Sequence, residues 1–131
     1  MKLFKNFWIS LLWAALILVA CAIPGNELNK VSLISIPYFD KIVHFGFYFV
    51  FSFLLMIGYV KFHSKVRKRT YIYPLNISAI YGGSIEMLQN AVFVNRGADW
   101  SDFIANVLGS VFGILAFFLL KSFPNIYKNI Y

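Results

Sequence analysis

Four long apolar segments limit what this chain can fold into more than any other feature of its sequence. They cover residues 7–23, 42–62, 71–93 and 103–120. A helix needs about 20 mostly apolar residues to cross a hydrocarbon layer about 30 Å thick, and each segment meets that length. We therefore predict an all-α polytopic membrane protein, in which residues 1–131 form a single domain built as a bundle of four transmembrane helices.

The composition agrees with a membrane protein and argues against a soluble one. Hydrophobic residues make up 60% of the chain and charged residues only 13%, which is more apolar than a soluble domain of this size requires. The net charge of +7 would suit nucleic acid if it were spread over a folded surface. The basic residues instead gather between the apolar segments, so we expect no nucleic-acid partner. The single cysteine, Cys21, excludes an internal disulfide and a multi-cysteine metal site.

Lysine and arginine predict the orientation, because cytoplasmic loops of membrane proteins retain the basic residues. If all four segments cross, the rule predicts that both termini are cytoplasmic and that residues 95–102 lie outside. The third segment is the least apolar of the four, and this charge asymmetry supports it as a crossing. The cytoplasmic side then holds Lys2, Lys5, Lys61, Lys65, Arg67, Lys68, Arg69, Lys121 and Lys128, and the other side Lys30, Lys41 and Arg96.

The first segment has two interpretations. Its basic start and apolar run are typical of a membrane helix that the protein keeps. The same run ends in Leu18-Val19-Ala20-Cys21, which fits the loose pattern of a lipoprotein signal cleaved before its cysteine. We favour the retained helix. Either outcome leaves the other three segments in the same orientation.

The polar residues of the last three segments fall on one stripe per helix, near the same end of the bundle. Positions three or four apart share a helix face. A charge that faces hydrocarbon costs at least about 2.5 to 3.5 kcal/mol, so we expect the stripes to converge on one outward-facing pocket. The stripes are Asp40, His44 and Tyr48, with Lys41 beside them; Gly82, Glu86 and either Gln89 or Asn90; and Asp102, Asn106, Gly109 and Gly113.

Two further features concern how this pocket is built. We expect Arg96, in the loop after the third segment, to reach back and pair with Glu86, because its planar guanidinium suits a carboxylate. Small residues let membrane helices approach closely, so the glycines of these segments are predicted to be packing residues. They are Gly82, Gly83, Gly109 and Gly113.

Three blocks of sequence, in this order, resemble the signature of the VanZ-like membrane proteins. They are "DKIVHFGFY" from Asp40, "EMLQ" from Glu86 and "RGADWSDFIANVLGSVFG" from Arg96. The resemblance extends from Asp40 to Gly113 and implies a protein of the bacterial cytoplasmic (inner) membrane and cell envelope. The family takes its name from a protein associated with reduced sensitivity to teicoplanin, so the resemblance also implies a link to glycopeptide resistance.

Two classes of function fit the predicted pocket. The first is a binding protein for an anionic envelope lipid, a lipid-linked cell-wall precursor or a glycopeptide, with Arg96 as the anion contact. The second is a small intramembrane enzyme that acts on a lipid headgroup, with His44 and a carboxylate as acid and base. No serine or cysteine stands in a recognised nucleophile arrangement, which favours binding over catalysis. The candidate residues are Asp40, Lys41, His44, Tyr48, Glu86, Gln89, Arg96, Asp99, Asp102 and Asn106.

Structural roles compete with these functional ones. His44 fits a buried histidine bonded to Asp40 or Glu86, and Asp99 or Asp102 fits the N-terminal cap of the fourth helix. The chain lacks an HExxH motif and any paired-histidine spacing, so we expect no metal and no cofactor. A structural subunit of an envelope complex is a further alternative. A transporter would require a homo-oligomer, because four helices are few for an alternating-access path, and the sequence leaves the oligomeric state open.

Overall fold

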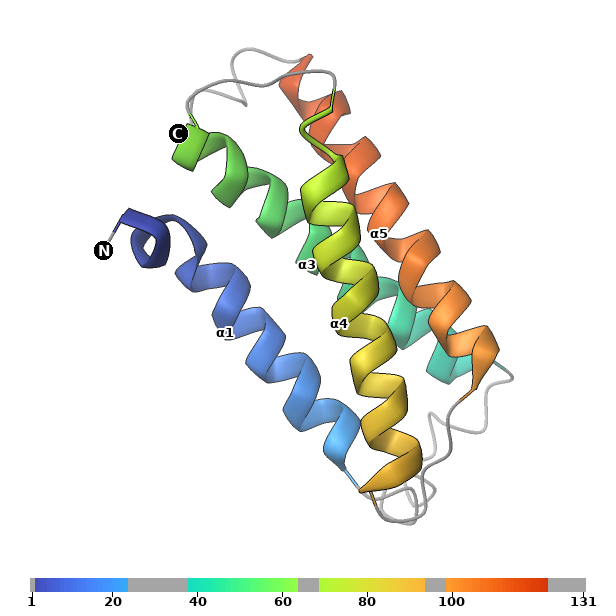
Figure 1. Ribbon diagram of the computed structural model, residues 1–131. Helices are drawn as coiled ribbons and strands as arrows, with labels where there is room; N and C mark the ends of the chain where they lie inside the picture. Colours follow the sequence, from blue (N-terminus) through green and yellow to red (C-terminus); the bar gives the residue numbers. More distant parts are fainter. Residues whose placement is uncertain (1, 24–37, 64–68, 94–98, 123–131) are drawn as a thin grey trace.

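The computed structural model describes residues 2–23, 38–63, 69–93 and 99–122. These residues form four α-helices, one for each apolar segment of the sequence (Figure 1). Three of them begin earlier than predicted, because a helix can continue into polar residues beyond the apolar stretch. The helices are α1 (Lys2–Ala22), α3 (Phe39–His63), α4 (Ile72–Ala91) and α5 (Trp100–Lys121).

Three of the described helices, α1, α3 and α5, are long and apolar enough to cross a membrane. The chain is therefore a multi-pass membrane protein. The remaining helix, α4, has 20 residues and is less apolar than the other three. Its polar side chains include Ser78, Glu86 and Gln89, which are buried inside the bundle.

The helices run alternately in opposite directions, so α1 and α4 point one way and α3 and α5 the other (Figure 1). The most extensive interface joins α3 to α5. Long-range hydrogen bonds attach α1 to the other helices: Trp13 Nε1 donates to the carbonyl oxygen of Phe47 at 2.9 Å, and Tyr81 Oη donates to that of Ala14 at 2.7 Å. Because the directions alternate, the last turns of α1 and α4 and the first turns of α3 and α5 all lie at the same end of the bundle (Figure 1).

Two clusters of buried apolar residues form the core. One lies among α1, α3 and α4, and the other between α3 and α5. Because α3 contributes to both clusters, it is the central helix of the fold. The first cluster contains Ile17, Cys21, Tyr48, Phe51, Leu55 and Ile85, and the second Met56, Val60, Ile114 and Phe117.

Glycines allow α3 and α5 to touch through their backbones. A Cβ atom on Gly109 would collide with the backbone of Phe45, and one on Gly113 would collide with the carbonyl oxygen of Phe49 and the hydroxyl of Ser52. Small residues at four-residue spacing permit this kind of close approach between membrane helices. The interface consequently has no room for a side chain at either glycine.

The hydroxyls of three serines form hydrogen bonds between the helices in the same part of the bundle. Ser52 Oγ donates to the carbonyl oxygen of Ser110 at 2.9 Å, and the hydroxyls of Ser78 and Ser110 lie 2.6 Å apart. All three side chains are buried. These bonds connect α3, α4 and α5 where the helices are too close for larger polar groups.

We predict that Gly109→Ala destabilises the protein by about 1–3 kcal/mol or more, because the added methyl group meets backbone atoms that cannot rotate away. Gly46 is the matched control on α3, since nothing lies within 4 Å of a Cβ placed there. Gly46→Ala should leave the free energy of unfolding unchanged or raise it. Unfolding in mixed detergent micelles measures both variants, and equal effects would contradict the close contact.

Candidate functional site

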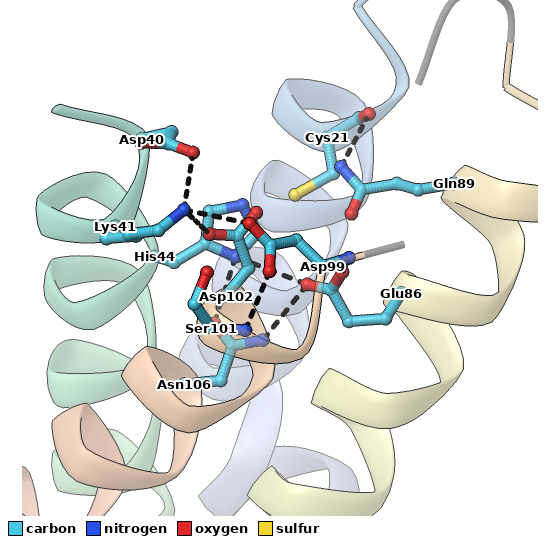
Figure 2. A network of polar contacts seen from close by, with 10 residues as sticks. All are labelled: Cys21, Asp40, Lys41, His44, Glu86, Gln89, Asp99, Ser101, Asp102 and Asn106. Atoms are coloured by element: carbon cyan, nitrogen blue, oxygen red, sulfur yellow. Dashed lines mark hydrogen bonds and ion pairs between the residues drawn. The ribbon is translucent and has the colours of Figure 1, made fainter. Parts of the chain in front are cut away.

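Polar side chains from α3, α4 and α5 meet at one end of the bundle (Figure 2). The contributing stretches are the start of α3, the last turns of α4 and the start of α5, which the alternating helix directions bring to the same end. Each stripe predicted from the sequence thus supplies members of one connected network. Its members are Asp40, Lys41, His44, Glu86, Asp99, Ser101, Asp102 and Asn106; Figure 2 also draws Gln89 and Cys21, which contact each other.

Lys41 lies among three carboxylates. Its Nζ atom is 3.0 Å from Asp40 Oδ2, 3.0 Å from Asp99 Oδ2 and 2.9 Å from Asp102 Oδ1. An ammonium group has three hydrogens to donate, so these contacts use all of them. Lys41 therefore ties the start of α3 to the start of α5 and keeps no donor for a ligand.

Asp99 is the N-cap of α5. Its Oδ1 atom accepts a 2.8 Å hydrogen bond from the backbone N–H of Ser101, as N-cap aspartates commonly do. The hydrogen bonds from Ser101, followed by that from Lys41, lower the pKa of Asp99 to about 2. The Asp99 side chain is therefore a carboxylate under all physiological conditions.

Asp102 does not cap α5, contrary to one of the two roles expected for it. The helix begins at Trp100, so Asp102 lies inside the first turn. Its side chain is largely buried and contacts Lys41. A carboxylate in the first turn still benefits from the positive end of the helix dipole.

A second part of the network links His44, Asn106 and Glu86. The Nδ1 atom of His44 lies 3.0 Å from Asn106 Oδ1. An amide oxygen only accepts hydrogen bonds, so Nδ1 carries the hydrogen in this contact. The same Nδ1 atom lies 3.6 Å from Glu86 Oε1, which allows an electrostatic contact but is long for a hydrogen bond.

Glu86 is a buried carboxylate with only long hydrogen bonds. Its Oε1 atom accepts from Asn106 Nδ2 at 3.5 Å, and its Oε2 atom accepts from the backbone N–H of Asp99 at 3.3 Å. Burying a charged carboxylate without strong partners costs several kcal/mol, by order of magnitude. Among the described residues, Glu86 is therefore the member of the network whose charge is least well compensated.

An apolar groove runs beside the network. It has a volume of about 510 Å³, and both Glu86 and Asp99 contribute to its wall. Several of its apolar lining side chains are exposed, among them Met87 at 73% and Trp100 at 82%. The groove thus places an apolar surface next to two carboxylates. Its lining residues are Ile80, Gly83, Ser84, Glu86, Met87, Asp99, Trp100 and Phe103.

The other predicted site residues lie at the edge of the network or outside it. Gln89 turns toward α1 and donates a 3.4 Å hydrogen bond to the carbonyl oxygen of Cys21. Tyr48 is fully buried, and its hydroxyl has no hydrogen-bond partner among the residues that the structure describes. Arg96 falls outside the described residues, so its expected pairing with Glu86 stays a prediction.

Two of the predicted packing glycines belong to α4. A Cβ atom on Gly82 would lie 3.2 Å from Tyr48 and 3.3 Å from Asn106, which is tighter than ordinary contact. Gly83 lines the groove, where a Cβ atom would be at an ordinary 3.6 Å from Phe103. Gly82 therefore lets the polar network pack against α4, and Gly83 keeps the groove open.

Sequence reasoning did not identify the groove. Its lining combines residues of α4 and α5 that are far apart in the sequence, and no sequence pattern indicates that they form one surface. Trp100 was the one available signal, because an aromatic residue beside charged ones is typical of a membrane interface. The central position of Lys41 was also missed, since the sequence shows only that it adjoins Asp40.

The fold and the network define a small helical membrane protein with a charged cluster at one end of its bundle. The family model VanZ/LLP1 matches residues 4–121, so the chain belongs to the VanZ/LLP1 family. The resemblance stated from the three sequence blocks is thereby confirmed. No curated protein and no solved structure matches the chain.

We predict that Tyr48→Phe leaves the free energy of unfolding unchanged or raises it by up to about 1 kcal/mol, because it removes a buried hydroxyl that has no described partner. The matched change is Tyr81→Phe, which breaks the bond to Ala14. It should cost about 0.5–1.5 kcal/mol. Unfolding in mixed micelles compares the two, and a clear loss of stability in Tyr48→Phe would point to a partner for its hydroxyl.

Proposed function

We propose that the protein crosses the cytoplasmic membrane four times, with both termini in the cytoplasm and residues 95–102 at the outer face. The helix directions support this topology. Since α3 and α5 run the same way, the chain must return across the membrane between them if both of them cross. The helix available for that return is α4, which runs in the opposite direction and packs against both.

The side-chain contacts of α4 support its role as a crossing helix. Asn76 Nδ2 donates to the carbonyl oxygen of Ile72 at 2.8 Å, and Ser84 Oγ donates to that of Ile80 at 2.8 Å. Such bonds within a helix satisfy polar side chains that face away from the bundle. Because Ser78, Glu86 and Gln89 are buried, α4 exposes few unsatisfied polar groups to lipid.

The contacts of α1 support a retained first helix rather than a cleaved signal. Removing α1 would break the bonds of Trp13 to α3 and of Tyr81 to α1. It would also remove Ile17 and Cys21 from the first core cluster.

Single-cysteine labelling tests the topology. In a Cys21→Ser background, we expect Ala98→Cys to react with a membrane-impermeant maleimide added outside the cell. We expect Ser64→Cys to react only after the membrane is made permeable. Labelling of residue 64 from outside would overturn the proposed orientation.

We propose that the groove and its polar wall bind an anionic envelope lipid or a lipid-linked cell-wall precursor. The observation that carries this proposal is the position of the groove: its apolar lining suits an acyl or prenyl chain, and it borders Glu86 and Asp99 of the charged cluster. A lipid needs this combination of an apolar channel and a polar end. In this proposal Arg96, three positions before Asp99 in the sequence, supplies a guanidinium to the anionic headgroup.

We predict that Gly83→Leu fills the groove and lowers lipid occupancy about fivefold or more, because overpacking of about 1–3 kcal/mol would oppose the lipid chain. Gly46→Leu is the control, since that position faces open space. Native mass spectrometry of gently solubilised protein measures the bound lipid and gives its mass.

Three outcomes separate the alternatives. Retention of an anionic lipid by wild type and Gly46→Leu, with loss in Gly83→Leu, supports the proposal, as does a loss in Arg96→Lys at unchanged thermal stability. Conversion of the bound lipid with time would indicate an enzyme instead. Wild-type protein that carries no lipid or precursor would overturn the binding proposal and favour a structural role in an envelope complex.

A further inference from the structure

Three buried side chains from three different helices place possible metal ligands at one point. They are His44 of α3, Glu86 of α4 and Asp102 of α5, which are 5%, 6% and 9% exposed. One ligand atom from each lies within 4.8 Å of the other two. A group of one imidazole and two carboxylates, held apart from solvent by the fold, is a donor set that divalent ions use.

One contact within this group is close to the spacing of ligands around a single ion. His44 Nδ1 lies 3.6 Å from Glu86 Oε1 and 3.0 Å from Asn106 Oδ1. Ligands about 2.1 Å from a tetrahedral zinc ion lie about 3.4 Å from one another. Because the three ligand atoms lie within 4.8 Å of one another, an ion at this point would require them to approach by up to about 1.4 Å. The amide oxygen of Asn106 would lie beside it as a further donor.

The charge balance of the cluster leaves a place for a cation. Its carboxylates are those of Asp40, Glu86, Asp99 and Asp102, and the described cation among them is Lys41. Lys41 already donates to three of these groups and does not contact the fourth, Glu86. Glu86 in turn has only long hydrogen bonds. Close carboxylates repel one another when buried, and a bound cation removes that repulsion.

We propose that His44, Glu86 and Asp102 bind one divalent cation of the zinc or manganese class. Imidazole favours transition metals, and carboxylates broaden the choice to manganese, whereas this group of three described residues contains no thiolate. Lys41 contacts Oδ1 of Asp102 and leaves its second oxygen for the ion. Neutral His44 is the form that coordinates a metal, so coordination through Nδ1 requires its ring hydrogen to move to Nε2, and coordination through Nε2 leaves the hydrogen on Nδ1.

This inference revises the expectation of no metal that the sequence suggested. Metal motifs in sequences are short-range patterns on one helix or loop, such as two histidines four residues apart. Here each ligand comes from a different helix, so no residue spacing in the sequence indicates the site.

The cation would also affect the groove. Glu86 belongs to both the cluster and the groove wall, so an ion held by Glu86 adjoins the groove. Its positive charge would offset the carboxylates that otherwise repel an anionic headgroup. The metal site itself does not depend on the proposed lipid, because it rests on the three ligands alone.

Metal titration of lipid-free protein in detergent tests the site. After treatment with EDTA and dialysis, isothermal titration with zinc chloride or manganese chloride should give one ion per chain. We expect Glu86→Gln and His44→Gln to weaken binding about tenfold or more. His63→Gln is the matched control, because His63 is the only other histidine of the chain and lies exposed at the opposite end of α3. It should bind like wild type.

Further measurements use the wild-type protein, so their results do not depend on whether a variant folds. The melting temperature of wild type should rise with added ion and fall back with EDTA, and cobalt substitution should give a visible spectrum typical of nitrogen and oxygen ligands. Absence of stoichiometric binding to wild type would overturn the inference, as would loss of binding in His63→Gln with binding kept in His44→Gln. Metal binding without a co-purified lipid would refute only the proposed function, and a bound lipid without metal binding would refute only the metal site.

Discussion

The backbone contact between α3 and α5 determines how the rest of the molecule is arranged. Gly109 and Gly113 let α5 lie directly on the carbonyl groups of Phe45 and Phe49. The two helices run in the same direction, so residues later in α3 meet residues later in α5 along their contact. Lys41 therefore meets Asp102, sixty-one positions later, and His44 meets Asn106, sixty-two positions later. The polar cluster depends on this register and would not form if α5 were shifted by one turn, about 5.4 Å.

Much of the fold could be predicted from the sequence because membrane helices have a strong physical signature. Apolar length locates each helix, and the cost of a charge in hydrocarbon indicates which polar residues face inward. The structure indeed brings His44, Glu86, Asp102 and Asn106 into one network. The helix ends were predicted less accurately, because the first turns of α3 and α5 contain polar residues, where hydropathy gives no information.

The partners of individual residues were harder to predict, since partnership depends on helix packing. Four-residue glycine spacing indicates a close contact but carries no information about which helix supplies it. Asp102 also fitted a helix cap as well as a buried carboxylate, and the actual start of α5 decided between them. The groove and the three-helix ligand set arise only when separate segments come together, so no local pattern encodes them.

The groove between α4 and α5 opens on the flank of the bundle, where Ile80, Met87 and Trp100 are exposed. In a membrane protein such a flank borders neighbouring lipid molecules rather than bulk water. A molecule that enters there arrives by diffusion within the plane of the bilayer. If the groove binds a lipid as proposed, its occupancy depends on the mole fraction of that lipid in the membrane, and a sparingly water-soluble compound would reach the groove without passing through the aqueous phase.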